Sequence, residues 1–188
     1  MKQFKDFKSE RSSTGRETLP AGGYVCQILS AKVEENDWGS TLVIAHDVCE
    51  GDYNGIFKRD YDQNTMENKK WRGTFRLKLP KDDGSEQDAW KKRSFNNFIW
   101  AVEQSNSGYH FDWDETKMKG LIVGGLFVLR EYEGQNGDIR QGTTLASWTT
   151  ADTVRNNKFK LPKDKLLKRE ESSSSSGFTP VTDDDLPF

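Results

Sequence analysis

A chain of 188 residues suggests one large domain, or one domain of ordinary size with additional segments. Of these residues 33% are apolar, 31% are charged and 2 are cysteines, and the formal net charge is −2. The absence of an apolar run near the roughly 18 residues of a membrane span, of a signal peptide in residues 1–16 and of a disulfide framework predicts a cytoplasmic protein without membrane contact.

Charge is distributed unevenly along the sequence. Residues 53–81 contain eight basic and three acidic residues, and residues 158–169 contain six basic residues and one acidic residue. Residues 170–188 contain five acidic residues and no basic one. This asymmetry favours a polyanionic partner for the body of the chain and a separate role for its acidic end. The alternative is an ordinary solvated surface.

The first expected elements are strands. A polar lead-in over residues 1–18 is followed by turn chemistry and then by β-branched and apolar residues, which predict strands over residues 24–33 and 41–49. Their short connection indicates an antiparallel hairpin. Residues 56–63 form a third candidate strand. Residues 71–79 alternate between apolar and mostly basic side chains, which predicts a strand with one apolar face and one basic face.

A helix is predicted over residues 87–104, because apolar side chains recur there at helical spacing and Ser85 is a suitable N-cap. Residues 121–133 form a long apolar strand, with a bend or bulge expected at its Gly-Gly pair. An Asn-Gly loop leads into a closing strand over residues 139–150.

One helix in an otherwise all-β order of elements predicts an OB-fold-like five-stranded barrel over residues 19–157. An α+β sheet with one covering helix gives the same order. Residues 158–182 are basic and then serine-rich, which is typical of a flexible linker. They lead to a short acidic tip over residues 183–188.

The tip carries a family resemblance. Its sequence is similar to the acidic C-terminal tip of bacterial-type single-stranded DNA-binding proteins, the SSB family, in which an OB barrel and a flexible linker precede it. The tip consists of Asp183, Asp184, Asp185, Leu186, Pro187 and Phe188. The body resembles phage and mobile-element proteins of Gram-positive hosts more loosely, in residues 19–24, 70–73, 107–114 and 121–133. The resemblance implies a phage-type SSB.

The tip is also suited to protein recognition on chemical grounds. A terminal carboxylate beside the Phe188 ring fits an apolar pocket with a cation at its rim. The three aspartates add long-range attraction to a basic partner. The same acidic residues can compete for the protein's own DNA groove, so removing the tip is expected to tighten DNA binding. The alternative is a chance acidic end.

Binding of single strands without sequence preference needs cations along the backbone and aromatic rings against the bases. On residues 56–63, taken as a strand, the candidate rings flank a cation on one face. The last hairpin is expected to carry a second set: Arg130 and Tyr132 share a face, Arg140 follows the turn, and Trp148 shares the face of Arg140. The candidate DNA-binding residues are Phe57, Lys58, Arg59, Tyr61, Lys69, Lys70, Arg72, Arg76, Lys78, Arg130, Tyr132, Arg140 and Trp148.

Signals of catalysis are weak. The pair His46 and Cys49 resembles half of a metal site without a second half, and no nucleotide-binding or nucleophile motif occurs. Asp60, Asp62 and Glu67 could form a two-metal nuclease site, but acids beside cations are a commoner pattern. We therefore expect no enzyme, no metal and no cofactor.

The expected function is sequence-independent binding and protection of single-stranded DNA. Replication, recombination and repair proteins would be recruited through the tip, and a homo-oligomer is possible. Three alternatives stay open: a strand-annealing or recombination-mediator protein, a metal-dependent nuclease, and an adaptor whose body binds no DNA.

Overall fold

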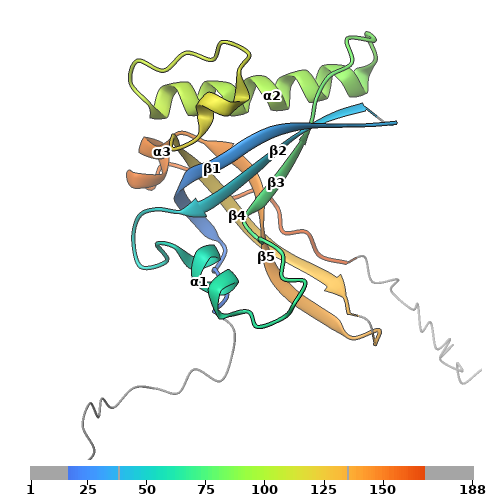
Figure 1. The fold of residues 1–188 in the computed structure, drawn as a ribbon, viewed down its shortest axis with the longest axis vertical. Helices are drawn as coiled ribbons and strands as arrows, with labels where there is room; N and C mark the ends of the chain where they lie inside the picture. Colours follow the sequence, from blue (N-terminus) through green and yellow to red (C-terminus); the bar gives the residue numbers. More distant parts are fainter. Residues whose placement is uncertain (1–16, 38, 135, 168–188) are drawn as a thin grey trace, which may run out of the picture.

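The computed structural model describes residues 17–37, 39–134 and 136–167, and Figure 1 shows their arrangement. The elements in chain order are β1 (Gly22–Asn36), β2 (Gly39–Val48), α1 (Ile56–Gln63), β3 (Thr74–Lys78), α2 (Glu86–Ser105), the 3₁₀ helix η1 (Glu115–Met118), β4 (Ile122–Glu133), β5 (Ile139–Thr149) and α3 (Ala151–Arg155).

The five strands form one antiparallel sheet in the order β3-β2-β1-β4-β5. The long strand β1 is central: it pairs with β2 along most of its length and with β4 through residues 22–27. This confirms the predicted all-β class, the first hairpin and the closing hairpin. The strand order, with the one long helix between β3 and β4, is compatible with an OB-fold-like arrangement.

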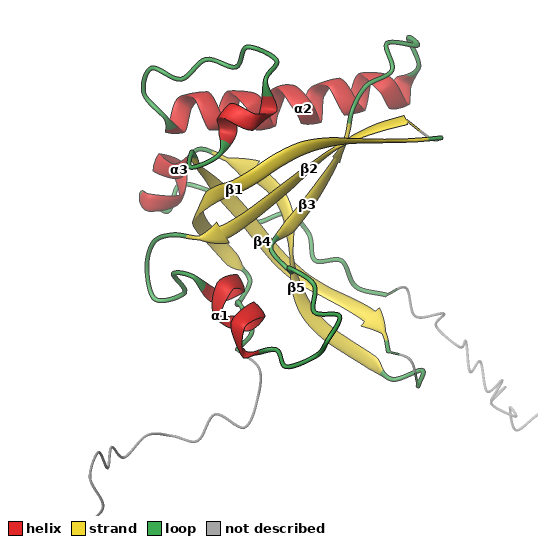
Figure 2. Ribbon diagram, viewed as in Figure 1, coloured by secondary structure: helices red, strands yellow, loops and turns green. Residues whose placement is uncertain are grey.

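Helix α2 packs across one end of the sheet (Figure 2). The side chains of Phe98, Ala101 and Val102 are fully buried in the core beneath it. The Ser85 hydroxyl accepts a hydrogen bond from the Asp88 amide at 3.1 Å, as expected for an N-cap. The predicted helix and its cap are therefore confirmed, with one further residue at each end.

Residues 56–63 are a helix, so the prediction of a strand there is wrong. The helix begins after Gly55, whose φ of 71° lies in the left-handed region. Its cap comes from another element: the Asp47 carboxylate at the end of β2 accepts hydrogen bonds from the amides of Phe57 at 3.0 Å and Lys58 at 2.9 Å. A carboxylate that satisfies free amides at a helix N-terminus stabilises the helix.

A bulge lies in β5 rather than at the Gly-Gly pair of β4. Leu126 pairs with Ser147 and Phe127 pairs with Leu145, so Ala146 has no partner across the ladder. Gly124 is required for close packing rather than for a bulge, because a Cβ atom there would lie 2.6 Å from the Thr150 carbonyl oxygen. The glycine allows the chain entering α3 to approach β4 closely.

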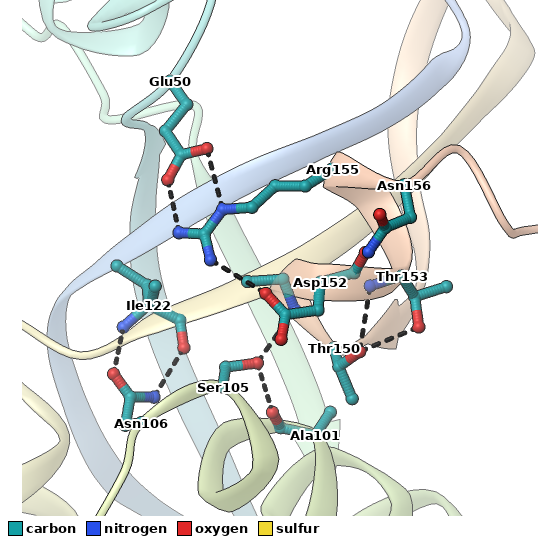
Figure 3. A network of polar contacts seen from close by, with 11 residues as sticks. Glu50, Ala101, Ser105, Asn106, Ile122, Thr150, Asp152, Thr153, Arg155 and Asn156 are labelled. Carbon is teal, nitrogen blue, oxygen red and sulfur yellow. Dashed lines mark hydrogen bonds and ion pairs between the residues drawn. The ribbon is translucent and has the colours of Figure 1, made fainter.

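Polar contacts hold α3 against the rest of the molecule (Figure 3). The Thr150 hydroxyl caps the helix by accepting from the Thr153 amide at 3.1 Å. The Ser105 hydroxyl, at the end of α2, accepts from the Ala151 amide at 2.9 Å. The Arg155 guanidinium binds the Glu50 carboxylate with two hydrogen bonds, at 2.6 and 3.2 Å.

After α3 the chain returns along β4. The Lys165 amide donates to the Leu129 carbonyl at 2.8 Å, and the Glu131 amide donates to the Lys165 carbonyl at 3.0 Å, which forms a short parallel bridge. The described part of the basic segment therefore packs against the sheet. No helix among the described residues combines the length and the hydropathy needed to cross a bilayer.

Candidate nucleic-acid interface

A cleft of about 550 Å³ lies where α1, the loop before β3 and the β4–β5 hairpin meet, with residues 17–19 along its side. Five of the predicted DNA-binding residues line it: Phe57, Arg72, Arg130, Tyr132 and Arg140. These residues come from segments far apart in the sequence. The fold therefore gathers a subset of the predicted site into one hollow.

Three arginines give the cleft its cations. Arg130 makes no ion pair with a described residue, and its side chain is exposed. The Arg140 side chain binds Asp138 at 2.6 Å, and this contact raises the pKa of the Arg140 guanidinium. Arg72 lies 3.9 Å from the Asp60 carboxylate. Of the three, Arg130 is the cation most available to an incoming phosphate.

The β4–β5 register places the hairpin residues as predicted. Tyr132 pairs with Arg140, and Arg130 pairs with Gly142, so all of these residues lie on one face of the hairpin. The Tyr132 ring lies across the hairpin, because a Cβ atom at Gly142 would be 3.5 Å from it. With 37% of Tyr132 exposed, the ring offers an open surface for stacking.

Phe57 and His46 form the inner wall of the cleft. The Phe57 ring is half-buried and lies edge-on to the His46 ring, with 5.6 Å between centroids. His46 is 1% exposed, and neither ring nitrogen has a partner of hydrogen-bond geometry among the described residues. Burial lowers the pKa of His46 from 6.5 to about 4, so the imidazole is neutral near pH 7.

The other predicted residues of α1 and the following loop are mostly engaged elsewhere. A strand would have placed Phe57, Arg59 and Tyr61 on one face, but in the helix only the two rings, four residues apart, share a face. Lys58 binds Asp62 at 2.8 Å, and Arg59 binds a carboxylate at 3.1 Å.

Tyr61 is already covered by protein groups. The Lys69 ammonium lies over its ring, 4.4 Å from the centroid, and the Trp71 ring is 5.8 Å away. Lys70 is exposed in the same loop and makes no ion pair with a described residue. The loop therefore adds one available cation near the cleft rather than a second stacking surface.

Arg76 and Lys78 lie on β3, outside the cleft. Both side chains are exposed on the strand face opposite Leu77, which confirms the predicted alternation. Arg76 binds Glu34 at 2.8 Å, and Lys78 borders a separate cavity of about 210 Å³. These two cations form a second basic surface that is partly neutralised.

Trp148 does not belong to the surface. Its side chain is 5% exposed and packs against the rings of Phe75, Phe98 and His46. The prediction that it shares a face with Arg140 is wrong, because the bulge at Ala146 shifts the alternation of side chains along β5 by one residue.

Sequence reasoning missed the polar side of the cleft. Gln141, Thr143 and Thr144 of β5 line it, and so does His46, which the sequence offered only as half of a metal site. A run of polar side chains along a strand next to an Asn-Gly turn is the signal that could have identified the three β5 residues. Nothing in the sequence places His46 near them.

The acidic residues considered for a nuclease do not converge. Asp62 binds Lys58, whereas the Asp60 side chain is nearly buried beside Arg72. In the described part of the chain, no group of three or more His, Cys, Asp or Glu side chains could hold a metal ion. The acidic tip, residues 183–188, lies outside the described residues.

Comparison with protein-family models and with curated proteins finds no match for this sequence.

Proposed function

We propose that this protein binds single-stranded DNA without sequence preference, with the strand lying in the cleft. The observation that carries this proposal is the convergence of Arg72, Arg130 and Arg140 with the rings of Tyr132 and Phe57 on one hollow. Cations that follow a phosphate backbone and rings that stack on bases are the two requirements of sequence-independent single-strand binding.

The exposed ring of Tyr132 supports a single strand rather than a duplex. A ring can stack on a base only when the face of that base is free, and in a duplex neighbouring base pairs cover both faces. The neutral side chain of Thr144 offers a hydroxyl to the strand. Gln141 already donates to Glu131 at 3.2 Å and the Thr143 hydroxyl donates to the Leu19 carbonyl, so each of these offers its oxygen as an acceptor. The cleft is therefore suited to unpaired nucleotides of any sequence.

The proposal extends to the context in which the protein acts. Bound strands would be protected in the cytoplasm during replication, recombination and repair, as the resemblance to the SSB family implies. Asp183, Asp184, Asp185, Leu186, Pro187 and Phe188 would recruit partner proteins. The role is binding rather than catalysis.

Two matched arginine substitutions test where DNA binds. Arg130→Ala removes a cleft cation that makes no ion pair with a described residue, and Arg76→Ala removes a cation of the β3 surface that Glu34 already neutralises. Fluorescence anisotropy with a labelled oligo-dT should show about tenfold weaker binding for Arg130→Ala. Less than a twofold change is expected for Arg76→Ala. Equal effects, or a larger effect of Arg76→Ala, would place the DNA outside the cleft.

A further inference from the structure

Helix α2 presents an exposed stripe on the side away from the core. Trp90 is 62% exposed and Trp100 is 53% exposed, although both belong to a helix whose other face packs on the core through Phe98, Ala101 and Val102. Arg93 and Asn97 lie between them and are exposed. Arg93 makes no ion pair with a described residue, whereas the Asn97 side-chain amide donates to the Trp148 carbonyl of β5 at 3.1 Å. Tryptophan and arginine are the residue types most enriched at the energetic centres of protein interfaces.

The stripe is remote from the DNA cleft. In Figure 2, α2 lies at the upper end of the molecule, whereas α1 and the β4–β5 hairpin lie at the lower end. A partner on the stripe would therefore leave the cleft open. DNA binding in the cleft therefore does not explain why the two tryptophans are exposed.

The residues of the stripe are spaced symmetrically about its centre, as a contact between two identical antiparallel helices requires. Counted from Phe95, Trp90 and Trp100 are five residues away on either side, and Arg93 and Asn97 are two residues away. With a rise of 1.5 Å per residue, the two tryptophans are about 15 Å apart along the axis. When two copies of the helix run antiparallel about this centre, each Trp90 is level with Trp100 of the second copy. Each Arg93 is then level with Asn97 of the second copy.

We propose that α2 is the contact between two copies of this chain, paired antiparallel about the level of Phe95, whose own side chain packs on the other side of the helix against Phe111 and Trp113. A two-fold contact requires a patch that is complementary to itself, and the stripe meets this condition. No carboxylate lies on α2 between Ala89 and Trp100, so no buried acid opposes the pairing. Arg93 lies within one helical turn of Trp100 of the second copy, which suits a cation–π contact.

The exposed aromatic area is appropriate for a modest dimer. An aromatic side chain buries about 150–250 Å² in full, so four half-exposed tryptophans supply on the order of 400–600 Å². Stable interfaces bury about 1,200–2,000 Å² in total, and the rest would come from the neighbouring side chains of a 20-residue helix. A dissociation constant on the order of micromolar is expected for an interface at the lower end of that range.

A second copy fits the stripe better than a nucleic acid does. A second DNA path would need several cations, but the stripe itself carries only Arg93 between its two tryptophans. Its N-terminal end also adjoins Glu86 and the exposed Asp82 and Asp83, which would repel phosphates. DNA binding to this face would contradict the pairing, and the experiment that follows is designed to detect it.

Sedimentation equilibrium of the full chain, over a wide concentration range, tests the pairing. We expect a monomer–dimer equilibrium that Trp90→Ala and Trp100→Ala each weaken at least tenfold. Trp113→Ala is the matched control: this tryptophan is 81% exposed but lies in the loop before η1, stacked on Phe95 with 6.1 Å between centroids. It should leave the equilibrium unchanged. Circular dichroism checks that each variant is folded.

Three results would overturn the proposal. The first is a full chain that stays monomeric at every concentration, and the second is a dimer that neither α2 substitution weakens. The third is a monomer in which Trp90→Ala and Trp100→Ala reduce oligo-dT affinity, which would make the stripe a DNA contact. The first two results are read from sedimentation alone and do not involve DNA, so the pairing can fail or hold independently of the proposed function.

Discussion

His46 lies at the inner wall of the cleft with no hydrogen-bond partner of ordinary geometry for either ring nitrogen among the described residues. The surrounding rings of Phe57, Phe127 and Trp148 exclude water and favour the neutral imidazole. A charge at this position would lose its hydration, and the nearby Ile44 backbone offsets only part of that cost. His46 therefore links the stability of the fold to pH.

The direction of this pH dependence follows from the pKa of His46, which is about 4 in the folded protein against 6.5 ordinarily. Between these values the unfolded chain binds a proton that the folded chain excludes, so stability falls as pH decreases toward 4. Urea unfolding of wild type and His46→Phe at about pH 7 and pH 5 measures the contribution of His46 to the free energy of unfolding, because the two proteins have all other titratable groups in common. Wild type should lose about 2 kcal/mol more than the variant. Equal losses would contradict the assignment.

Tyr132 is the residue whose ring is most clearly placed for base stacking. Stacking of one base on an aromatic side chain contributes about 1–3 kcal/mol. Tyr132→Ala should therefore weaken oligo-dT binding by about fivefold or more, whereas Tyr132→Phe keeps the ring and most of the affinity. Anisotropy titrations of both variants measure the difference. Equal losses in the two variants would assign the effect to the hydroxyl rather than to stacking.

At the scale of elements, α1 is the part of the fold that depends most on a distant residue. It has eight residues, and its N-cap position, Gly55, has no side chain to bind the free amides. The buried carboxylate of Asp47 binds two of them instead. A helix this short is marginal in isolation, so its stability must come from such tertiary contacts.

Substitution of Asp47 tests this dependence. Asp47→Ala leaves the amides of Phe57 and Lys58 without their acceptor, and should lower the free energy of unfolding by about 1–3 kcal/mol. Hydrogen exchange should show faster exchange across α1 than elsewhere, and oligo-dT affinity should fall because Phe57 is no longer held at the cleft. Ser85→Ala is the matched cap removal on α2 and should leave exchange in α1 unchanged. Unaltered exchange in α1 of Asp47→Ala would contradict the role of Asp47.

Local pattern explains which elements could be predicted. The strands β1, β2, β3, β4 and β5 and helix α2 each bury one face or both, so their periodicity is visible in the sequence. Helix α1 was mistaken for a strand because its cap lies on β2. Phe57 and Tyr61, four residues apart, suit a helix as well as a strand. The bulge at Ala146 leaves no local signal, and the face of Trp148 depended on it.

The candidate site was predictable only in part, for a related reason. Strand alternation predicts that Arg130 and Tyr132 share a face, and the Asn-Gly turn predicts a hairpin in which Arg140 follows. The pairing of Tyr132 with Arg140 then brings all three to one face. Whether a basic side chain is free is decided in part by carboxylates remote in sequence, such as Glu34 opposite Arg76. His46 lines the cleft because β2 packs against α1 and β5, and that packing could not be predicted from the local sequence.

For the whole molecule, binding to a polyanion is a matter of local rather than net charge. The formal net charge is −2, yet three arginines against two carboxylates, Glu17 and Asp60, line the cleft, and the acids of residues 170–188 are separate from them in sequence. Each phosphate that a cation neutralises releases counterions, so affinity for a single strand falls with salt. Three cleft arginines predict roughly a twentyfold loss between about 50 and about 200 mM salt.

The most direct test of single-strand binding in the cleft is the affinity for labelled oligo-dT against a duplex of equal length, at these two salt concentrations. A fluorescent label on the DNA is preferable to intrinsic fluorescence, because Trp90, Trp100 and Trp113 lie away from the cleft. The full chain should bind oligo-dT at least tenfold more tightly than duplex, with the stated salt dependence, and removal of residues 183–188 should tighten binding. Equal affinity for the two DNAs, or no binding by either form of the chain, would contradict the proposed function.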